Sequence, residues 1–198
     1  MNQINMNTYI SLLRGINVGG RKKLPMESLR RMYQDLGFTN IKTYLQSGNV
    51  VFASSIAFPT MLTQLIEAGI AQACGYAVQV FIRRVEEIQR IVSNNPYLEN
   101  KNIDATRLHV LFLYQQPVES AWNKVTASAN IPDQFARGET VLYLHYPNGY
   151  AKAKLPASFF EKLLGVPLTD RNWNTVTALK KIAVEMDAAL REGNLDAS

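Results

Sequence analysis

The order of strand-like and helix-like segments constrains the fold of this chain more than any other feature. Short runs of aromatic and aliphatic residues predict strands, and apolar residues at helical spacing predict helices. In the first half, strands are expected at 8–13, 41–45, 50–53 and 77–82, and helices at 25–36 and 59–74. Gly48 lies between the two middle strands and indicates a hairpin turn. A connecting helix is expected at 86–92.

The second half repeats this order. Strands are expected at 108–114, 134–137, 141–146 and 168–171, helices at 117–129 and 156–164, and a long last helix at 173–190. Gly138 and Glu139 occupy the second hairpin turn, and glycine in the first turn position predicts a type II′ turn. The order β-α-β-β-α-β is the split βαβ arrangement. The predicted fold class is therefore α+β, a tandem duplication of ferredoxin-like (βαββαβ) units with extra helices and antiparallel sheets.

This order also predicts the domain organisation. The first unit is expected at 1–83, a connecting helix and linker at 84–106, the second unit at 107–171 and a C-terminal helix at 172–198. The strands at 8–13 and 108–114 are apolar on both alternating faces, which is expected of a sheet covered on both sides. Two helices cover only one face, so the sister unit, the extra helices or a second chain must cover the other. An oligomer through the uncovered sheet face is one of these alternatives.

The composition narrows the class of protein without identifying a function. The chain has 198 residues, 47% of them hydrophobic and 19% charged, with a formal net charge of +5. This positive balance favours anionic partners. One cysteine, Cys74, excludes an intrachain disulfide and a cysteine-based zinc cluster. We expect no signal peptide, no membrane segment, no metal and no cofactor, and a cytoplasmic protein.

The segment between the first strand and its helix is longer than the fold requires. The second half has only Gln115 and Gln116 before Pro117, whereas the first half has the sequence RGINVGGRKKL before Pro25. We call residues 14–24 the glycine loop. Loops longer than their topology demands are more often functional than structural. Glycine-rich backbone beside cations and a helix start favours binding of phosphate or carboxylate. The candidate ligand-binding residues here are Arg14, Gly15, Asn17, Gly19, Gly20, Arg21 and Lys23, with Lys22 as a further cation.

This loop matches neither the P-loop nor the dinucleotide GxGxxG motif. The alternative interpretation is a surface loop with solvated charges.

Three further segments carry candidate ligand-binding residues, and each has a structural alternative. Gln46, Ser47 and Asn49 are also typical of a turn. Lys152 and Lys154 lie near two tyrosines and are also typical of a solvated loop.

The last segment is RNWNTVT, which opens the final helix. Asn172 is expected to cap this helix, which leaves free N–H groups beside Arg171. Arg171 and Asn174 are candidates for an anion site, while Trp173 is expected to be a core anchor. His109 and His145 lie on neighbouring strands, but two histidines without a third ligand make a weak metal site.

Several of these stretches resemble a known family. The sequences LRGINVGG, QSGNVVF and RNWNTVT, together with the segments around them from about residue 9 to 179, are similar to the bacterial domain of unknown function 1697 family. The resemblance implies an α+β fold of ferredoxin-like halves. It supplies no established activity or ligand, and therefore no catalytic residue.

Three functions remain as hypotheses. The first is binding of a phosphorylated or nucleotide-like ligand in a basic cleft near the glycine loop. The second is nucleic-acid binding across the basic surface, and the third is a structural or interaction role. Whether the protein is an enzyme stays open, because no general base or nucleophile is recognisable.

Overall fold

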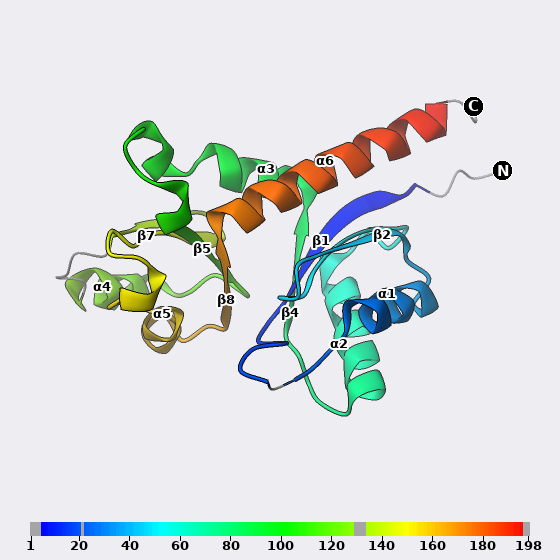
Figure 1. The fold of residues 1–198 in the computed structure, drawn as a ribbon, viewed down its shortest axis with the longest axis horizontal. Helices are drawn as coiled ribbons and strands as arrows, with labels where there is room; N and C mark the ends of the chain where they lie inside the picture. The colour runs from blue at the N-terminus through cyan, green and yellow to red at the C-terminus, as the bar shows by residue number, and fades with distance from the viewer. Residues whose placement is uncertain (1–4, 21, 129–133, 196–198) are drawn as a thin grey trace. The chain divides into compact units, whose positions relative to one another are not determined.

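The chain folds into two compact units. The structure, a computed structural model, describes residues 5–20, 22–128 and 134–195. The first unit comprises Met1–Gln89 and Ala178–Ser198, and the second comprises Arg90–Thr177 (Figure 1). The division into segments 1–83, 84–106, 107–171 and 172–198 stays a prediction.

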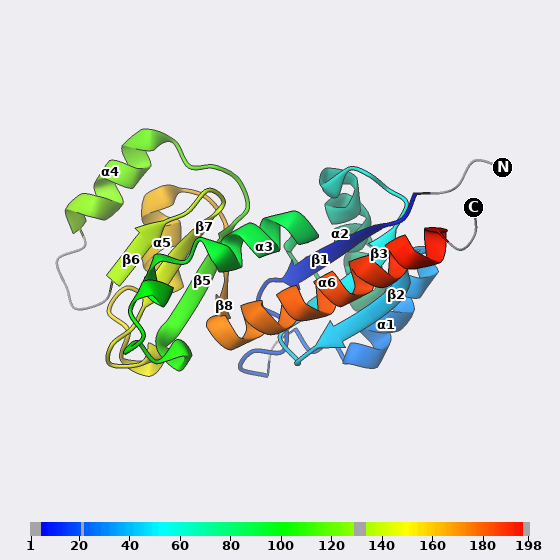
Figure 2. The same cartoon turned by 90° about the horizontal axis from the view of Figure 1, so that it is seen from above.

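The first unit contains a four-stranded antiparallel sheet. Its elements are β1 (Asn7–Leu13), α1 (Met26–Asp35), β2 (Thr39–Tyr44), β3 (Asn49–Ser54), α2 (Pro59–Cys74) and β4 (Val80–Arg84). The strands lie in the order β2-β3-β1-β4. Both α1 and α2 cover the same face of this sheet (Figures 1 and 2). Leu29, Met32 and Tyr33 are the buried residues of α1, so the helix buries the face predicted from its spacing.

The second unit repeats this topology. Its elements are β5 (Leu108–Leu113), α4 (Glu119–Ser128), β6 (Gln134–Arg137), β7 (Val141–His145), α5 (Ala157–Leu164) and β8 (Leu168–Asn172). The strands lie in the equivalent order β6-β7-β5-β8. The predicted fold class is confirmed. The predicted end of the helix at Ala129 lies outside the described residues.

A few element boundaries differ from the prediction. The strand expected at 77–82 begins at Val80, because residues 77–79 form a connection at the sheet end. Three short 3₁₀ helices, η1 (Pro96–Glu99), η2 (Ala105–Arg107) and η3 (Tyr150–Lys152), were not expected. They are single turns, too short to give a periodic pattern.

The predicted type II′ turn at Gly138 is wrong. That turn requires a positive φ at its first central residue, and Gly138 is not among the glycines with positive φ. A Cβ at this position would lie 2.8 Å from Val141 Cγ2 and 2.9 Å from Tyr143 Cε2. Glycine is therefore needed at this hairpin for the close approach of neighbouring side chains, not for its backbone freedom.

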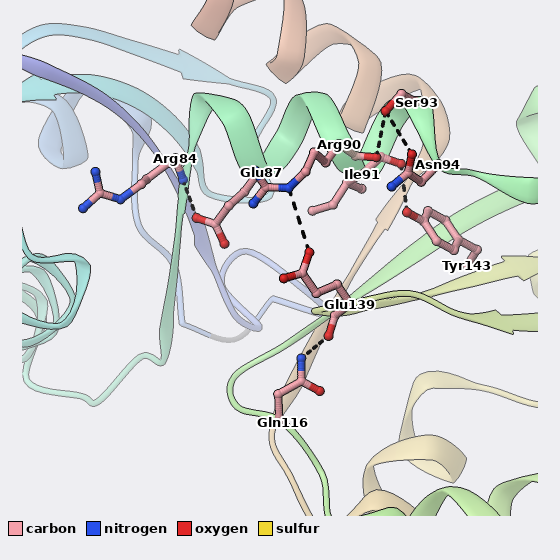
Figure 3. A network of polar contacts seen from close by, with 9 residues as sticks. All are labelled: Arg84, Glu87, Arg90, Ile91, Ser93, Asn94, Gln116, Glu139 and Tyr143. Carbon is pink, nitrogen blue, oxygen red and sulfur yellow. Dashed lines mark hydrogen bonds and ion pairs between the residues drawn. The ribbon is translucent and has the colours of Figure 1, made fainter.

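Two trailing helices connect the units in sequence. From Arg90 onward, α3 (Val85–Ser93) groups with the second unit, where Ile91 O accepts a 3.0 Å hydrogen bond from the Tyr143 hydroxyl (Figure 3). Burial raises the pKa of Tyr143 to about 12. Glu139, in the turn between β6 and β7, also contacts α3, because its Oε2 lies 3.9 Å from Arg90 Nε. The backbone carbonyl of Glu139 accepts a hydrogen bond from the Gln116 side chain.

The other trailing helix covers the first sheet. From Ala178 onward, α6 (Trp173–Leu195) groups with the first unit and runs along the sheet face opposite α1 and α2 (Figures 1 and 2). Strand residues on this face are buried within the single chain: Ile10, Leu12, Val51, Ala53 and Phe81. An extra helix thus covers the face. Among the alternatives for covering this face, the extra helix is the one found on these strands, and an oligomer stays a prediction.

Candidate functional site

The topology brings most candidates of the first half to one end of the first sheet. Strand β1 ends where β4 begins, and the β2–β3 turn lies beside them, with Leu12 opposite Asn49 and Leu13 opposite Val80. Leu13 N donates to Gly48 O at 2.8 Å, and Arg14 N donates to Gln79 O at 2.9 Å. The glycine loop, the turn at 45–48 and the connection at 75–79 therefore meet at this end. That they bind a ligand stays a prediction.

Asn17 holds the glycine loop in place. Its side-chain oxygen accepts from Leu24 N at 2.8 Å, and its side-chain nitrogen donates to Leu24 O at 2.9 Å and to Gln46 O at 2.8 Å. The side chain thus closes the loop and ties it to the β2–β3 turn. Asn17 and Gln46, both candidates from the sequence, make structural contacts here, and Gln46 contributes its backbone carbonyl.

Two cations line a cavity of about 330 Å³ beside the loop. Its lining residues are Arg14, Gly15, Lys22, Glu67, Ala77, Val78 and Gln79. Arg14 Nη1 donates to Gln79 Oε1 at 2.8 Å, and Lys22 Nζ donates to Ala77 O at 2.8 Å. Glu67 Oε1 accepts from Val80 N at 2.9 Å. The cavity thus has two positioned positive groups and one carboxylate that already accepts a backbone hydrogen bond.

The three glycines of the loop are exposed and have positive φ. Gly15, Gly19 and Gly20 have φ of 67°, 58° and 75°, and a Cβ on any of them would meet no described atom within 4 Å. The glycines therefore provide backbone conformation rather than close packing. Arg21 lies outside the described residues. Lys23 is exposed, and its carbonyl accepts a 3.0 Å hydrogen bond from the Tyr76 hydroxyl.

Backbone strain gathers at this sheet end. Asn17, Lys22 and Leu45 have φ of 55°, 46° and 56°, and they are three of the four described non-glycine residues with positive φ. Asparagine tolerates this conformation, whereas lysine and leucine cost about 1–2 kcal/mol each. Strained residues cluster at functional sites because the surrounding structure must hold them there. Leu45 is also 56% exposed, so packing of its side chain does not explain the strain.

Leu45→Asn is expected to raise the free energy of unfolding by about 1 kcal/mol, because asparagine adopts a positive φ with less strain. Urea denaturation of the variant beside the wild type checks this. A loss of stability would show that the leucine side chain makes a compensating contact.

The turn candidates have mainly structural contacts. Asn49 is fully buried, and its side-chain nitrogen donates to Tyr44 O and to Ser47 Oγ, each at 2.9 Å. Both bonds close the β2–β3 turn. A role for Gln46, Ser47 or Asn49 in ligand binding stays a prediction.

The remaining candidates belong to the second unit. Lys152 and Lys154 are exposed on the connection after β7, and Asn174 is exposed in the first turn of α6. Arg171 is only 7% exposed, and its Nη1 donates to Thr169 Oγ1 at 2.9 Å and to Asp170 O at 2.7 Å. Burial lowers the pKa of Arg171 to about 10.

The expectations for the start of α6 are confirmed where they concern structure. Asn172 Oδ1 accepts from Thr175 N at 2.9 Å, so Asn172 caps the helix. Trp173 is 5% exposed and is a core residue.

Arg171 lies opposite Val110, and Arg83 lies opposite Ile10 in the first unit. Both arginines are buried and donate to the carbonyl of the preceding residue, so they share one structural role.

A polar cluster in the second unit was missed by sequence reasoning. His109 Nδ1 lies 3.0 Å from Asp170 Oδ1, and the Tyr150 ring stacks on the His109 ring with centroids 4.6 Å apart. Burial and Asp170 raise the pKa of Tyr150. The signal in the sequence was an aspartate within a predicted strand beside a histidine-bearing strand. No group of three or more His, Cys, Asp or Glu in the described ranges is arranged to hold a metal ion.

The equivalent position in the first unit shows that the fold does not need this cluster. Tyr9 lies opposite Arg84 near the start of β1, as His109 lies opposite Asn172 near the start of β5. Tyr9 packs in the apolar core and donates to Ile56 O at 2.9 Å.

None of the helices that the structure describes combines the length and the hydropathy that a membrane-spanning segment needs.

Comparison with known proteins gives a family and a fold. The profile of the family "Protein of unknown function (DUF1697)" matches residues 6–143. A conserved bacterial protein from Streptococcus pneumoniae has a similar solved structure, with a TM-score of 0.69 and 24% sequence identity, covering 90% of this chain and 99% of its own. Curated protein sequences give no match. The first similarity covers most of the chain, and the chain belongs to the DUF1697 family of proteins of unknown function.

Proposed function

We propose that the protein binds a small anionic ligand of the phosphate type in the cavity beside the glycine loop. The observation that carries this proposal is the pair of cations at the rim, Arg14 and Lys22, on a cavity of about 330 Å³. Arginine binds phosphate bidentately, and lysine binds it as a point charge. The cavity lies at the small end of the range for ligand sites, which favours a compact phosphorylated molecule.

The surrounding structure supports this assignment. Gln79 and the Ala77 carbonyl hold the two cations in fixed positions, so little side-chain entropy remains to be lost on binding. The exposed backbone of Gly15 adjoins them, and glycine-rich backbone supplies N–H donors for anions. The strained Lys22 lies on the cavity wall. The formal net charge of +5 favours the approach of an anion.

Arg14→Ala is expected to abolish the thermal stabilisation that pyrophosphate gives the wild type, because it removes the bidentate donor. At a pyrophosphate concentration about 100 times Kd, the wild type is expected to gain about 5–10 °C in Tm. Arg31→Ala is the matched control, since Arg31 is exposed on α1 and forms an ion pair with Glu27 there. Equal stabilisation of wild type and Arg14→Ala would contradict the site.

Nucleic-acid binding is the alternative, and the basic charge of the chain favours it. A protein that contacts several phosphates loses affinity steeply as salt rises, whereas a single small ligand gives a shallow dependence. A steep dependence with an oligonucleotide would therefore favour the alternative. A structural or interaction role would give no response to either probe. No reaction is proposed.

We also infer that the two units arose by internal duplication and that the protein works in the cytoplasm. The equal strand orders and the matching positions of Arg83 and Arg171 support the duplication. The single cysteine fits a reducing compartment, because such a chain forms no disulfide within itself.

A further inference from the structure

Glu67 brings a negative charge into the cavity beside the glycine loop. It lies on α2, it is partly buried, and it lines the cavity together with Arg14 and Lys22. Within the described parts of the chain Glu67 forms no ion pair, so neither cation neutralises it directly. A carboxylate repels a bound phosphate, and a site for phosphate alone would bind more tightly without it. Glu67 therefore indicates a second chemical group on the ligand.

One short segment, 77–80, holds all three charged side chains. Its first residue accepts a 2.8 Å hydrogen bond from Lys22 Nζ, and its last residue donates its backbone N–H to Glu67 Oε1 at 2.9 Å. Arg14 is held between them, where its Nη1 donates to Gln79 Oε1 at 2.8 Å. Such a segment spans at most about 11 Å, so one compact molecule can reach the two cations and the carboxylate together.

The charges of the cavity match a ligand with both an anionic and a cationic group. A phosphate monoester carries about two negative charges at neutral pH, and the two cations balance them. The carboxylate then lacks a counter-charge, which an ammonium group on the ligand supplies. A ligand hydroxyl would also donate a hydrogen bond to the carboxylate, but it would leave the negative charge unbalanced. Charge balance thus favours an ammonium group over a hydroxyl group.

We propose that the ligand of this cavity is a phosphorylated amine, in which a short carbon chain joins a phosphate monoester to a primary ammonium group. Arg14 and Lys22 bind the phosphate, and the carboxylate of Glu67 accepts a hydrogen bond from the ammonium. This inference rests on the proposed function, because it takes the cavity as the phosphate site. It adds selectivity, since a phosphate without an ammonium group leaves the carboxylate unpaired beside an anion.

Calorimetric titration of the wild type with two matched probes tests the proposal. O-phosphoethanolamine carries the ammonium group, and ethyl phosphate has the same carbon skeleton without it. O-phosphoethanolamine is expected to bind at least about ten-fold more tightly, the effect of one charge-assisted hydrogen bond. Equal affinities, or tighter binding of ethyl phosphate, would overturn the proposal.

A third probe separates a free phosphorylated amine from a lipid headgroup. Glycerophosphoethanolamine has the same ammonium group, but its phosphate is a diester with one negative charge, as in a phospholipid. It balances only one of the two cations and is expected to bind more weakly than O-phosphoethanolamine. Equal or tighter binding of the diester would overturn the assignment of a monoester.

Glu67→Gln tests whether the carboxylate causes the preference. Glutamine keeps a side-chain oxygen that accepts from Val80 N, so the link between α2 and β4 is retained. The variant is expected to bind O-phosphoethanolamine about ten-fold more weakly and ethyl phosphate slightly more tightly, because the repulsion is gone. Glu27→Gln is the matched control, since Glu27 is an exposed carboxylate of α1 that does not line the cavity. A purely structural role for Glu67 would change both affinities alike and would overturn the proposal.

Failure of this inference and failure of the proposed function give different results. If pyrophosphate stabilises the wild type through Arg14 while O-phosphoethanolamine and ethyl phosphate bind alike, the cavity binds phosphate and only the role of Glu67 is wrong. If none of these probes binds, pyrophosphate included, the proposed function is wrong and this inference is overturned with it.

Discussion

Gly48→Ala is expected to lower the free energy of unfolding by about 3 kcal/mol, the combined effect of a strained backbone and an overpacked turn. Gly48 has a φ of 73°, a conformation that alanine adopts only with strain. A Cβ there would lie 2.7 Å from Leu13 Cβ and 2.6 Å from Ile16 Cδ1. The Ile16 side chain can rotate, but Leu13 Cβ is fixed by strand β1. Urea denaturation followed by circular dichroism measures the loss.

Gly75→Ala is the matched control for this variant. Gly75 has nearly the same φ, 76°, at the end of α2, yet a Cβ there would meet no described atom within 4 Å. Its alanine variant is expected to lose only about 1 kcal/mol, from the backbone alone. Equal losses at the two positions would show that the close approach at Gly48 contributes nothing.

Asn17→Ala is expected to lower the free energy of unfolding by about 2–3 kcal/mol. Three side-chain hydrogen bonds disappear, and the N–H and C=O of Leu24, a buried residue, lose their partner in the loop. Each such bond contributes about 1 kcal/mol, and an unpaired buried group adds to the loss. The variant is also expected to bind pyrophosphate more weakly, because the loop that carries Lys22 loses its ties to Leu24 and Gln46.

Asn40→Ala is the control that separates the loss of the Asn17 hydrogen bonds from the cost of placing alanine at a positive φ. Asn40 has a φ of 51°, close to the 55° of Asn17, and it is exposed on β2. Its alanine variant therefore loses only the preference of asparagine for this conformation, about 1 kcal/mol. A loss at Asn17 no larger than at Asn40 would mean that the loop does not depend on these bonds.

Much of the fold was predictable because local signals and tertiary packing agree. The helix at 59–74 has a proline at its start and Gly75 at its end, and its predicted bounds equal those of α2. The start of β4 was not predictable, because Ala77 and Val78 are as apolar as the strand that follows. Their place outside the sheet depends on the contacts of Arg14 and Lys22 with this connection.

The candidate site was predictable in position but not in detail. The surplus length of the glycine loop indicated where to look. The role of Asn17 was not visible, because an asparagine that ties a loop and one that binds a ligand look alike in a sequence. For Asn49 the sequence indicated a turn residue and left a ligand contact open as the alternative. Gln79 and Glu67 carried no signal. Gln79 reaches the cavity because β1 pairs with β4, and Glu67 reaches it from α2, where it accepts a hydrogen bond from Val80 N.

The binding of an anion by the glycine loop is tested most directly by NMR on the wild-type protein. Pyrophosphate is titrated into ¹⁵N-labelled protein while the amide signals of Gly15, Gly19 and Gly20 are followed. The expected result is a saturable shift of these signals that Arg14→Ala removes. Signals that do not move, or that move in both proteins alike, would contradict the proposed site.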